Sequence, residues 1–378
     1  MTLADFAQSW RREDFVVGGM EESVRTPALV LNRDLLDGNI AAMHDLLGVH
    51  WRPHVKTSKL EWTMRRLVAA GVTRCKCATT LELECALRAG FEDVLVAFAH
   101  RGPAARRIAE LAAATSARVS VLVEDSGAVD QWCGTRVCMV IDVDPGIHRT
   151  GIPCDRRDRV VALAHDVAAA GLTMYGLHSY EASPPAGSAE SRLAWCAPGF
   201  EALSLLCADL AAAGHPVHEI ATSGSETWSL ALSSPWLAGL PCAHTVSPGS
   251  VVYNDAYKAP QVPGREHLRP AAVVVTRVTS MGQDRLTLDA GHKAIAPSIT
   301  GLPGVILGCP ELRMETPSEE HGPVTVLDRS SVSYGDMVAV VPTHIGPTVN
   351  LHDHAVIVND GEVVGVEPVS ARGHEAPM

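Results

Sequence analysis

Short apolar runs alternate with amphipathic stretches from about residue 26 to residue 250. In the amphipathic stretches, hydrophobic residues recur at helical spacing, as Leu60, Met64, Leu67 and Val68 do. Several of these stretches end in glycine, which is typical of a helix end. Buried strands separated by helices predict parallel βαβ units, and about eight such units would close a TIM barrel. A doubly wound sheet is the alternative, but no Gly-x-Gly-x-x-Gly follows the first strand.

The expected elements of this part follow from the same alternation. The strands are expected at 28–31, 54–56, 75–78, 94–98, 118–123, 137–142, 174–180 and 218–222. Between them, the clearest helices are expected at 157–170 and 200–213.

The pattern changes after about residue 265, where helical periodicity fades and short valine-rich runs take over. Residues 356–364 predict two strands joined by a turn at Asp360-Gly361, a strong hairpin signal. We therefore predict an α/β fold with two domains. A barrel is expected over 22–262, and a mostly-β domain is expected to combine residues 263–378 with residues 1–21. The stretch 259–264, rich in proline and glycine, is the expected boundary. Trp10 and Phe15 are expected to pack on the β domain.

Composition narrows the possible partners. Hydrophobic residues make up 47% of the 378 residues, enough for a large core, and the formal net charge is −12. An acidic chain without lysine or arginine blocks is a poor candidate for binding nucleic acid or anionic membranes. The 10 cysteines lie mostly in apolar stretches, which indicates reduced thiols in a cytoplasmic protein. The N-terminus lacks the apolar core of a signal peptide, and no apolar run approaches the roughly 18 residues that span a bilayer.

Lys56 is the first candidate for chemistry, in the segment Arg52-Pro53-His54-Val55-Lys56-Thr57-Ser58-Lys59. A lysine at the carboxyl end of a barrel strand lies where barrel active sites are built, and it can form a Schiff base with a carbonyl compound. The alternative is a solvated surface lysine, which is the commoner fate of this residue type.

The segment resembles the Arg-Pro-His-x-Lys-Thr-His-Lys motif of the D-threonine aldolase, D-serine dehydratase and 3-hydroxyaspartate aldolase group. These are pyridoxal-phosphate enzymes related to the alanine racemase barrel. Further stretches resemble the group in the same order along nearly the whole chain. They are 77–84, 142–151, 176–180, 288–294, 318–322 and 341–351.

The resemblance implies roles for residues around the barrel mouth. Lys56 would form the Schiff base with the cofactor and act as an acid and base on one face of it, with His54 beside it. Arg149 would lie near the pyridine nitrogen or ring, the alternative being a surface ion pair. Tyr180 would bond cofactor or substrate, and a half-buried tyrosine with a satisfied hydroxyl is nearly as good an interpretation.

The phosphate group of the cofactor needs backbone N–H groups from loops. By the resemblance, the matching run is Thr222-Ser-Gly-Ser-Glu-Thr227, in which Thr222, Gly224 and Ser225 would bind the phosphate. Gly249 and Ser250 would close the phosphate site. Ordinary turns are the competing interpretation of both segments.

The motif that holds a divalent cation in the group is incomplete here. His344 remains, but position 346, where the group has a cysteine or aspartate, is Gly346. One histidine is a weak metal site, so binding of Mn, Zn or Mg is uncertain. A site rebuilt from His321, His352, Asp353 and His354 is the alternative. Ser58 is a second departure, because the group has histidine there.

Three functions stay open. The first is a lyase that cleaves or dehydrates a D-configured β-hydroxy amino acid, with altered or absent metal dependence. The second is an amino-acid racemase or epimerase that uses Lys56 and a second base, which the sequence does not identify. The third is a non-catalytic pyridoxal-phosphate carrier, which the C-terminal β domain disfavours because single-barrel carriers lack one. The resemblance also implies a homodimer.

Overall fold

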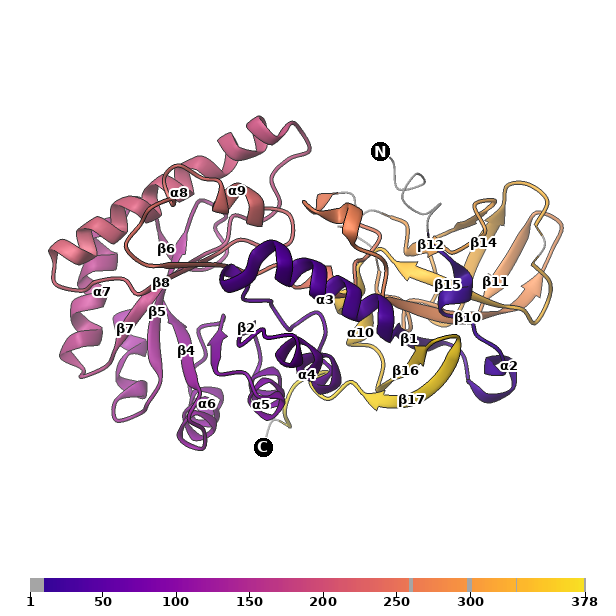
Figure 1. Cartoon of the computed structure of the whole chain (residues 1–378), viewed down its shortest axis with the longest axis horizontal. Helices are drawn as coiled ribbons and strands as arrows, with labels where there is room; N and C mark the ends of the chain where they lie inside the picture. The colour runs from indigo at the N-terminus through magenta and orange to yellow at the C-terminus, as the bar shows by residue number, and fades with distance from the viewer. Residues whose placement is uncertain (1–9, 258–260, 298–300, 331, 377–378) are drawn as a thin grey trace. The chain divides into compact units, whose positions relative to one another are not determined.

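The computed structural model describes residues 10–257, 261–297, 301–330 and 332–376, in which the chain forms two compact units (Figure 1). The barrel unit comprises Leu47–Lys56, Leu67–Gly249 and the residues from His374 onward. The β unit comprises the residues up to Leu46, Thr57–Arg66 and Ser250–Gly373. Residues 259 and 260 of the expected boundary lie outside the described residues.

The barrel unit alternates strands and helices as the sequence predicts. Its strands are β2 (Arg74–Cys77), β3 (Asp93–Val96), β4 (Arg118–Val123), β5 (Cys138–Asp144), β6 (Ile152–Pro153), β7 (Met174–Ser179), β8 (Glu219–Thr222) and β9 (Ala243–Val246). Its helices are α5 (Thr80–Ala89), α6 (Pro103–Ala113), α7 (Arg157–Ala169), α8 (Ala189–Ala212) and α9 (Trp228–Leu232). Both α3 (Arg33–Leu47) and α4 (Glu61–Ala69) contain residues of both units.

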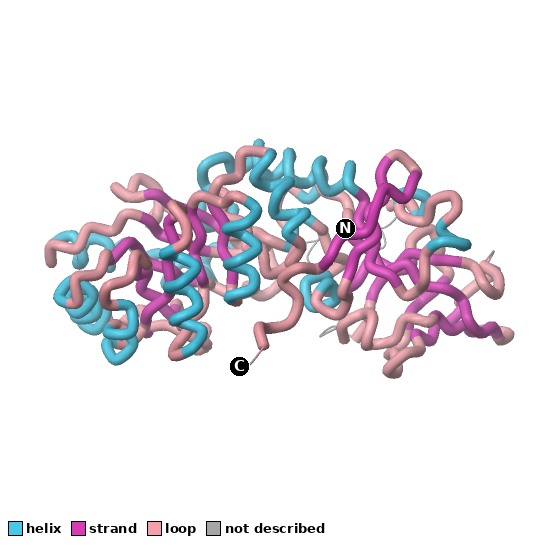
Figure 2. Tube along the Cα trace, turned by 90° about the horizontal axis from the view of Figure 1, so that it is seen from below, coloured by secondary structure: helices cyan, strands magenta, loops and turns pink. Residues whose placement is uncertain are grey.

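Parallel pairing closes the barrel. The sheet runs β2-β3-β4-β5-β7-β8-β9, with β6 paired to the end of β5. Residues 51–55 fill the gap between its two edges, because Trp51 bridges to Val246 of β9 and His54 bridges to Lys76 of β2. The expected barrel is therefore confirmed, with the unpredicted strand β9 in place of the one expected at 28–31, and its helices lie outside the strands (Figure 2).

Helix α8 begins earlier than expected, since the sequence predicts a helix only from residue 200. Pro198 lies inside it. Among the described residues, α8 alone is long and apolar enough to cross a membrane by length and composition. Its residues Phe200, Leu203 and Leu206 are buried in the protein, as in a core helix of a globular domain.

The barrel interior is filled in layers. At the amino ends of the strands, the buried guanidinium of Arg52 pairs with Asp93 of β3 at 2.7 Å and with Glu219 of β8 at 2.7 Å. Burial would raise the pKa of Asp93, but Arg52 and Arg118 hold that pKa below its usual range. The next layer is an apolar cluster whose buried members are Leu95, Leu122, Val140 and Ala221. Polar side chains lie above it, toward the carboxyl ends of the strands.

The β unit is built on one mixed sheet. Its strands are β1 (Ala28–Asn32), β10 (Ala272–Met281), β11 (Arg285–Leu288), β12 (Gly304–Ile306), β13 (Leu312–Met314), β14 (Gly322–Val326), β15 (Met337–Pro342), β16 (His354–Asn359) and β17 (Glu362–Pro368). They follow the order β13-β14-β11-β10-β1-β16-β17, with β15 pairing β10 and β12. The unit also holds the short helices α2 (Met20–Ser23) and α10 (Ile345–Val349). The expected mostly-β character after the barrel is confirmed.

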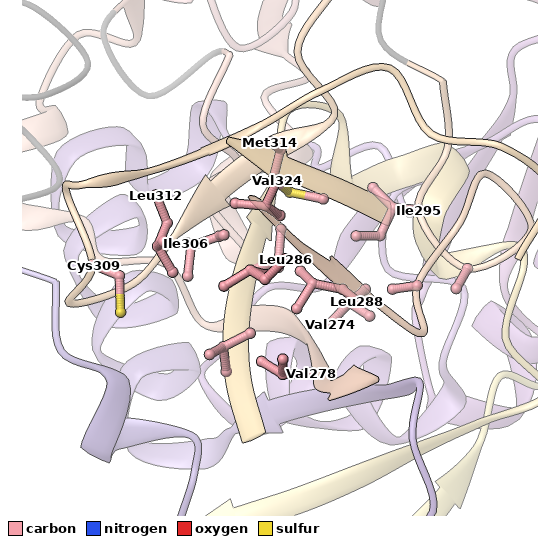
Figure 3. Packing of buried hydrophobic residues seen from close by; sticks show 14 residues of the cluster. Val274, Val278, Leu286, Leu288, Ile295, Ile306, Cys309, Leu312, Met314 and Val324 are labelled. Atoms are coloured by element: carbon pink, nitrogen blue, oxygen red, sulfur yellow. The ribbon is translucent and has the colours of Figure 1, made fainter. Parts of the chain in front are cut away.

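Two apolar clusters hold this sheet. Trp10 and Phe15 pack with Val273, Val275 and Met337, as the sequence predicts. The second cluster joins β10, β11, β13 and β14 around the side chains that Figure 3 shows. They include Leu286, Leu288, Ile306, Met314 and Val324. Burial of such side chains, at about 25 cal/mol per Å² of apolar surface, is the main stabilising contribution of this unit.

The first expected strand belongs to a different sheet from the one that the alternation suggests. Residues 28–31 were expected to start the βαβ series, but β1 pairs antiparallel with β10 and parallel with β16. Leu29, Val30 and Leu31 are all buried, so both faces of the strand are covered. A fully apolar strand fits a central position in either sheet, and its pattern does not distinguish them.

The hairpin signal is confirmed. Strands β16 and β17 pair antiparallel, and Asp360 and Gly361 have φ of 49° and 77°. Two positive φ values in a two-residue loop match the right-handed twist of the strands, and aspartate and glycine are the residues that tolerate them.

We expect Arg52→Met to lower the free energy of unfolding by about 3 kcal/mol or more, because it leaves the Glu219 carboxylate buried without its cationic partner and removes one of the two arginines that pair with Asp93. Urea unfolding followed by circular dichroism measures the loss. Arg157→Met is the control, since it removes an ion pair with Asp209 on the surface, and its unfolding midpoint should change little. Equal effects of the two substitutions would show that the buried cluster does not stabilise the barrel.

Candidate active site

Lys56 lies directly after the barrel segment 51–55, at the carboxyl end of that strand, and its side chain is exposed. The strand is fixed on one side by hydrogen bonds from Val55 N to Lys76 O (2.8 Å) and from Lys76 N to Pro53 O (2.9 Å). On the other side, Arg52 N donates to Val246 O at 3.0 Å. Backbone pairing of a rigid strand therefore sets the position of this amine in the barrel mouth.

Gly249 approaches the same strand. A Cβ atom at Gly249 would lie 2.3 Å from the backbone oxygen of His54, so no other residue fits without moving the backbone. The preceding residue, Pro248, accepts a hydrogen bond from Trp51 Nε1 at 3.0 Å. The loop after β9 is thus held against the strand that carries Lys56.

Arg149 and Tyr180 meet in a small pocket of the barrel mouth, which Asp142 and His178 also line. The Arg149 guanidinium lies over the Tyr180 ring, 4.9 Å from its centroid. The Arg149 loop is held by the Asp144 carboxylate, which accepts backbone N–H groups of residues 146–148 at 2.7–3.1 Å. This cation–π contact fixes the guanidinium and the ring relative to each other in the barrel mouth.

The loop 222–227 connects β8 to α9. Gly224 packs against Tyr180, since a Cβ atom there would be 3.1 Å from the Tyr180 ring. Thr222 Oγ1 lies 2.8 Å from His244 Nε2. Gly224 N donates to Thr227 Oγ1 at 3.2 Å. The hydroxyls and amides that could hold an anion are therefore already arranged by contacts within the loop and with Tyr180 and His244.

Glu181 is a buried carboxyl group under this loop that the sequence analysis did not identify. Its Oε2 accepts hydrogen bonds from Ser223 Oγ (3.0 Å) and Thr227 Oγ1 (3.3 Å). Its Oε1 is buried and has no hydrogen-bond partner among the described residues. Burial raises the pKa of Glu181 to about 7, against the hydrogen bonds to its backbone and to Ser223 that lower it. The protonated form is therefore accessible near neutrality, and it could donate a hydrogen bond to a bound anion.

A second polar group in the mouth, also missed, joins three barrel strands. Lys76 Nζ of β2 lies 3.3 Å from His178 Nε2 of β7, and His178 Nδ1 lies 2.7 Å from Asp142 Oδ1 of β5. All three side chains are buried. Burial and, after it, the charge of Lys56 lower the pKa of Lys76 to about 7. Perturbed ionisable groups in a barrel mouth mark a candidate functional site.

The structure gathers most of the predicted site residues in the barrel unit. His54, Lys56, Arg149, Tyr180, Thr222, Gly224, Ser225 and Gly249 all belong to it. Ser250 and His344 belong to the β unit. Ser250 is buried at the start of a 3₁₀ turn, and His344 precedes α10.

The residues of the metal motif do not form a cation site. Gly346 has no ligand atom, and His352 Nε2 lies 2.9 Å from the carbonyl oxygen of Ala294. Asp353 is paired with Arg372 at 2.5 Å. Within the part of the chain that the structure describes, no three His, Cys, Asp or Glu side chains gather to hold a metal ion. The alternative of a rebuilt site is therefore not supported.

Lys76 had a signal in the sequence, because it lies between two cysteines of an expected strand. The register of β5 and β7, which only the structure gives, places Asp142 and His178 at paired positions. Inward positions alternate along a barrel strand, so these side chains share a face. Glu181 gave no such signal, because it follows the last residues of a strand and its partners come from another loop.

Comparison with known proteins gives a consistent result. The family described as "Putative serine dehydratase domain" matches residues 271–358. The chain is 31% identical to 3-hydroxy-D-aspartate aldolase of Paracoccus denitrificans (strain Pd 1222), over 94% of each chain. It is 29% identical to D-threonine aldolase of Arthrobacter sp, over 93% of each chain.

Solved structures agree with this result. The structure of D-threonine aldolase from Filomicrobium marinum is similar with a TM-score of 0.82 and 28% identity, covering 93% of this chain and 96% of that one. Alanine racemase of Clostridium difficile 630 matches with a TM-score of 0.68 and 15% identity over 92% of this chain and 99% of that one. The second likeness concerns the fold alone.

We expect Glu181→Gln to stabilise the protein at pH 8 by about 2–3 kcal/mol and to have little effect near pH 4.5. The folded-state pKa of about 7 lies above the usual 4.5, so the wild-type protein loses stability as pH rises through that window. Urea unfolding of both proteins at several pH values measures the difference. Glu190→Gln, at an exposed glutamate of α8, should show no such pH dependence. A difference between Glu181→Gln and wild type that stays constant with pH would contradict the assignment.

Proposed function

This chain belongs to the family of D-threonine aldolases and 3-hydroxy-D-aspartate aldolases, and we propose that it is a pyridoxal-phosphate-dependent lyase. Its substrate would be a D-configured β-hydroxy amino acid, cleaved by retro-aldol reaction or dehydrated. The observation that carries the proposal is the exposed amine of Lys56 at the carboxyl end of a barrel strand, in the same mouth as the Arg149–Tyr180 pair.

The residues present fit pyridoxal phosphate. Lys56 would carry it, with His54 beside the attachment point. Gly249 leaves space that a side chain would fill, and Gly224 lets the loop 222–227 lie against Tyr180. Thr222, Gly224, Ser225, Gly249 and Ser250 would supply amides and hydroxyls to the phosphate group. When bound, the cofactor would withdraw electrons from the bonds to the substrate's Cα atom.

Arg149 and Glu181 would adjust the two ends of this site. An arginine keeps its protons at any physiological pH, so Arg149 would not protonate a ring nitrogen and would weaken the electron sink. Glu181 beside the phosphate loop would oppose an anion when charged. With its pKa raised to about 7 by burial, it can instead stay protonated and donate from Oε1.

A divalent cation does not fit the residues present. The chemistry of the donor set decides this, since His344 is joined by no second side-chain ligand at position 346. We therefore derive no step through a metal ion. Orientation of the substrate's β-hydroxyl would fall to side chains of the site itself.

Lys56→Ala is expected to abolish an absorbance band of bound cofactor that borohydride bleaches in the wild-type protein, because the covalent link is lost. The band is measured on purified protein incubated with pyridoxal phosphate. Lys293→Ala is the matched control, as Lys293 is an exposed lysine paired with Glu319 on the β unit. Retention of the bleachable band in Lys56→Ala would refute the assignment of this lysine.

Gly346→Asp tests the interpretation of the metal motif. A Cβ atom at Gly346 would make only ordinary contacts, at 3.7 Å from Thr57, so the substitution should fold. We expect wild-type activity to be insensitive to chelator, and the variant to gain activation by Mn or Zn. The assay uses D-threonine, D-serine and D-3-hydroxyaspartate with each metal and with chelator.

The same panel separates the functions. Cleavage or dehydration supports the lyase, and exchange of the α-hydrogen alone would favour the racemase alternative. Loss of wild-type activity on chelation would show that a cation binds despite Gly346.

A further inference from the structure

Lys76 is a buried amine next to the strand that carries Lys56. It is 3% exposed and lies in β2, whose other buried neighbours are the cysteines on either side. Because β2 pairs with residues 53–55, the Lys76 side chain emerges beside His54, two residues before Lys56. A lysine is almost never buried without a specific partner, so its position calls for a physical explanation.

The partner of Lys76 lies across the barrel. Strands β2 and β7 are not neighbours in the sheet, so the 3.3 Å contact between Lys76 Nζ and His178 Nε2 crosses the interior. The Asp142 carboxylate, which only accepts, lies 2.7 Å from His178 Nδ1. That nitrogen must therefore carry the ring hydrogen. His178 Nε2 is left with a lone pair directed at the amine of Lys76.

This arrangement is suited to stabilising a proton on Lys76. A neutral imidazole accepts a hydrogen bond from an ammonium group, and the Asp142 carboxylate compensates the added charge through the ring. Burial is the main cause that lowers the pKa of His178, and the charge of Lys76 is the second, so the imidazole itself stays neutral. Asp142, in contrast, has its pKa held low by His178 against the effect of burial, and it keeps its negative charge.

The charges around Lys76 decide when it takes that proton. The ionisable groups that face it are Lys56, His54, His178, Asp142, Glu181 and Arg149. Burial and the charge of Lys56 are the two largest influences that favour the neutral amine, and Glu181 and Asp142 oppose them. Repulsion between two amines is mutual, so loss of the Lys56 charge must favour protonation of Lys76.

We propose that Lys76 is the proton acceptor of this site: it is neutral while Lys56 carries a charge, and it takes up a proton when the Lys56 ammonium is consumed. The inference rests on the proposed function of Lys56. For Lys56 to condense with an aldehyde, its ammonium must first release one proton, which leaves a lone pair on Nζ. A neutral C=N bond would then form at Nζ, and the carbonyl oxygen would leave as water. The lone pair of Lys76 Nζ accepts that proton, and the Asp142–His178 pair holds it.

Lys76 is a proton-accepting group that the sequence alone did not identify. A site without a complete metal motif still needs a group that accepts and returns protons near neutral pH. Lys76 lies in the same mouth as Lys56 and carries its own relay to a carboxylate. Lys76 holds the proton that Lys56 releases, so it affects the reaction through the protonation state of Lys56.

Difference potentiometric titration of the full-length chain without added cofactor tests the proposal. The titration curve of Lys76→Met is subtracted from that of wild type, and the difference reports the protons bound by Lys76. We expect one proton with a midpoint near pH 7. In a Lys56→Met background the same subtraction should give a midpoint higher by about one pH unit, which is a tenfold change in proton affinity.

Two further variants keep the result interpretable. Lys76→Arg replaces Lys76→Met if the latter folds poorly. Its arginine keeps a permanent positive charge, so the difference between its titration curve and that of wild type should give the same midpoint. Lys293→Met, at the exposed lysine of the β unit, should give a midpoint above the ordinary lysine value of about 10, because Glu319 and Glu320 raise the pKa of Lys293. A purely structural Lys76 would titrate like Lys293, or would show no change on Lys56→Met, and either result would overturn the proposal.

This titration does not depend on cofactor binding. Absence of a borohydride-sensitive band would refute the proposed function of Lys56, and the linkage between the two amines would still be decided by the titration curves. The protein could fail to bind pyridoxal phosphate while the Lys76 midpoint still depends on Lys56. That result would support proton exchange between the two lysines with another carbonyl compound as the ligand.

Discussion

The buried guanidinium of Arg52 is the interaction on which the barrel depends. It bonds carboxylates of β3 and β8 and the backbone oxygen of Cys75, so it links the short segment 51–55 to three strands of the sheet. That segment makes isolated bridges to β2 and β9 and three backbone hydrogen bonds to them. The Arg52 side chain reinforces this register, because a charge desolvated at that depth is tolerated only where its partners hold it. Lys56 follows four residues later, and its place in the mouth is a consequence of this register.

Charge in the barrel is separated by an apolar layer. Below it, Arg52 and Arg118 pair with the carboxylates of Asp93 and Glu219. Above it, Lys76, His178, Asp142 and Glu181 are also buried but incompletely compensated. The lower group stabilises the fold, whereas the upper group costs stability and leaves protons that can move near neutral pH. Buried ionisable groups of the second kind are typical of sites that perform acid and base chemistry.

The departures from the family motif and the polar groups of the mouth suggest one account. The chain has Gly346 where a metal ligand is expected and Ser58 where a histidine is expected, so two groups that could handle a hydroxyl or a proton are missing. A buried lysine with a histidine–aspartate relay and a carboxyl group with a raised pKa lie in the same barrel mouth. In this account, the chemistry moves from a cation to the amino and carboxyl groups of the barrel.

The sequence by itself determined the local elements and the anchoring lysine. Short apolar runs between helical patterns identified most of the barrel strands, the turn at Asp360-Gly361 identified the hairpin, and the motif around Lys56 identified the family. These signals are local, because propensity, turn geometry and a contiguous motif need only neighbouring residues. The tertiary structure alone decided that β1 joins the sheet of β10 and β16, and that 51–55 closes the barrel. It also decided that Lys76, His178 and Asp142 meet across the interior, since contacts between strands far apart in sequence depend on pairing order and register, which no single strand encodes.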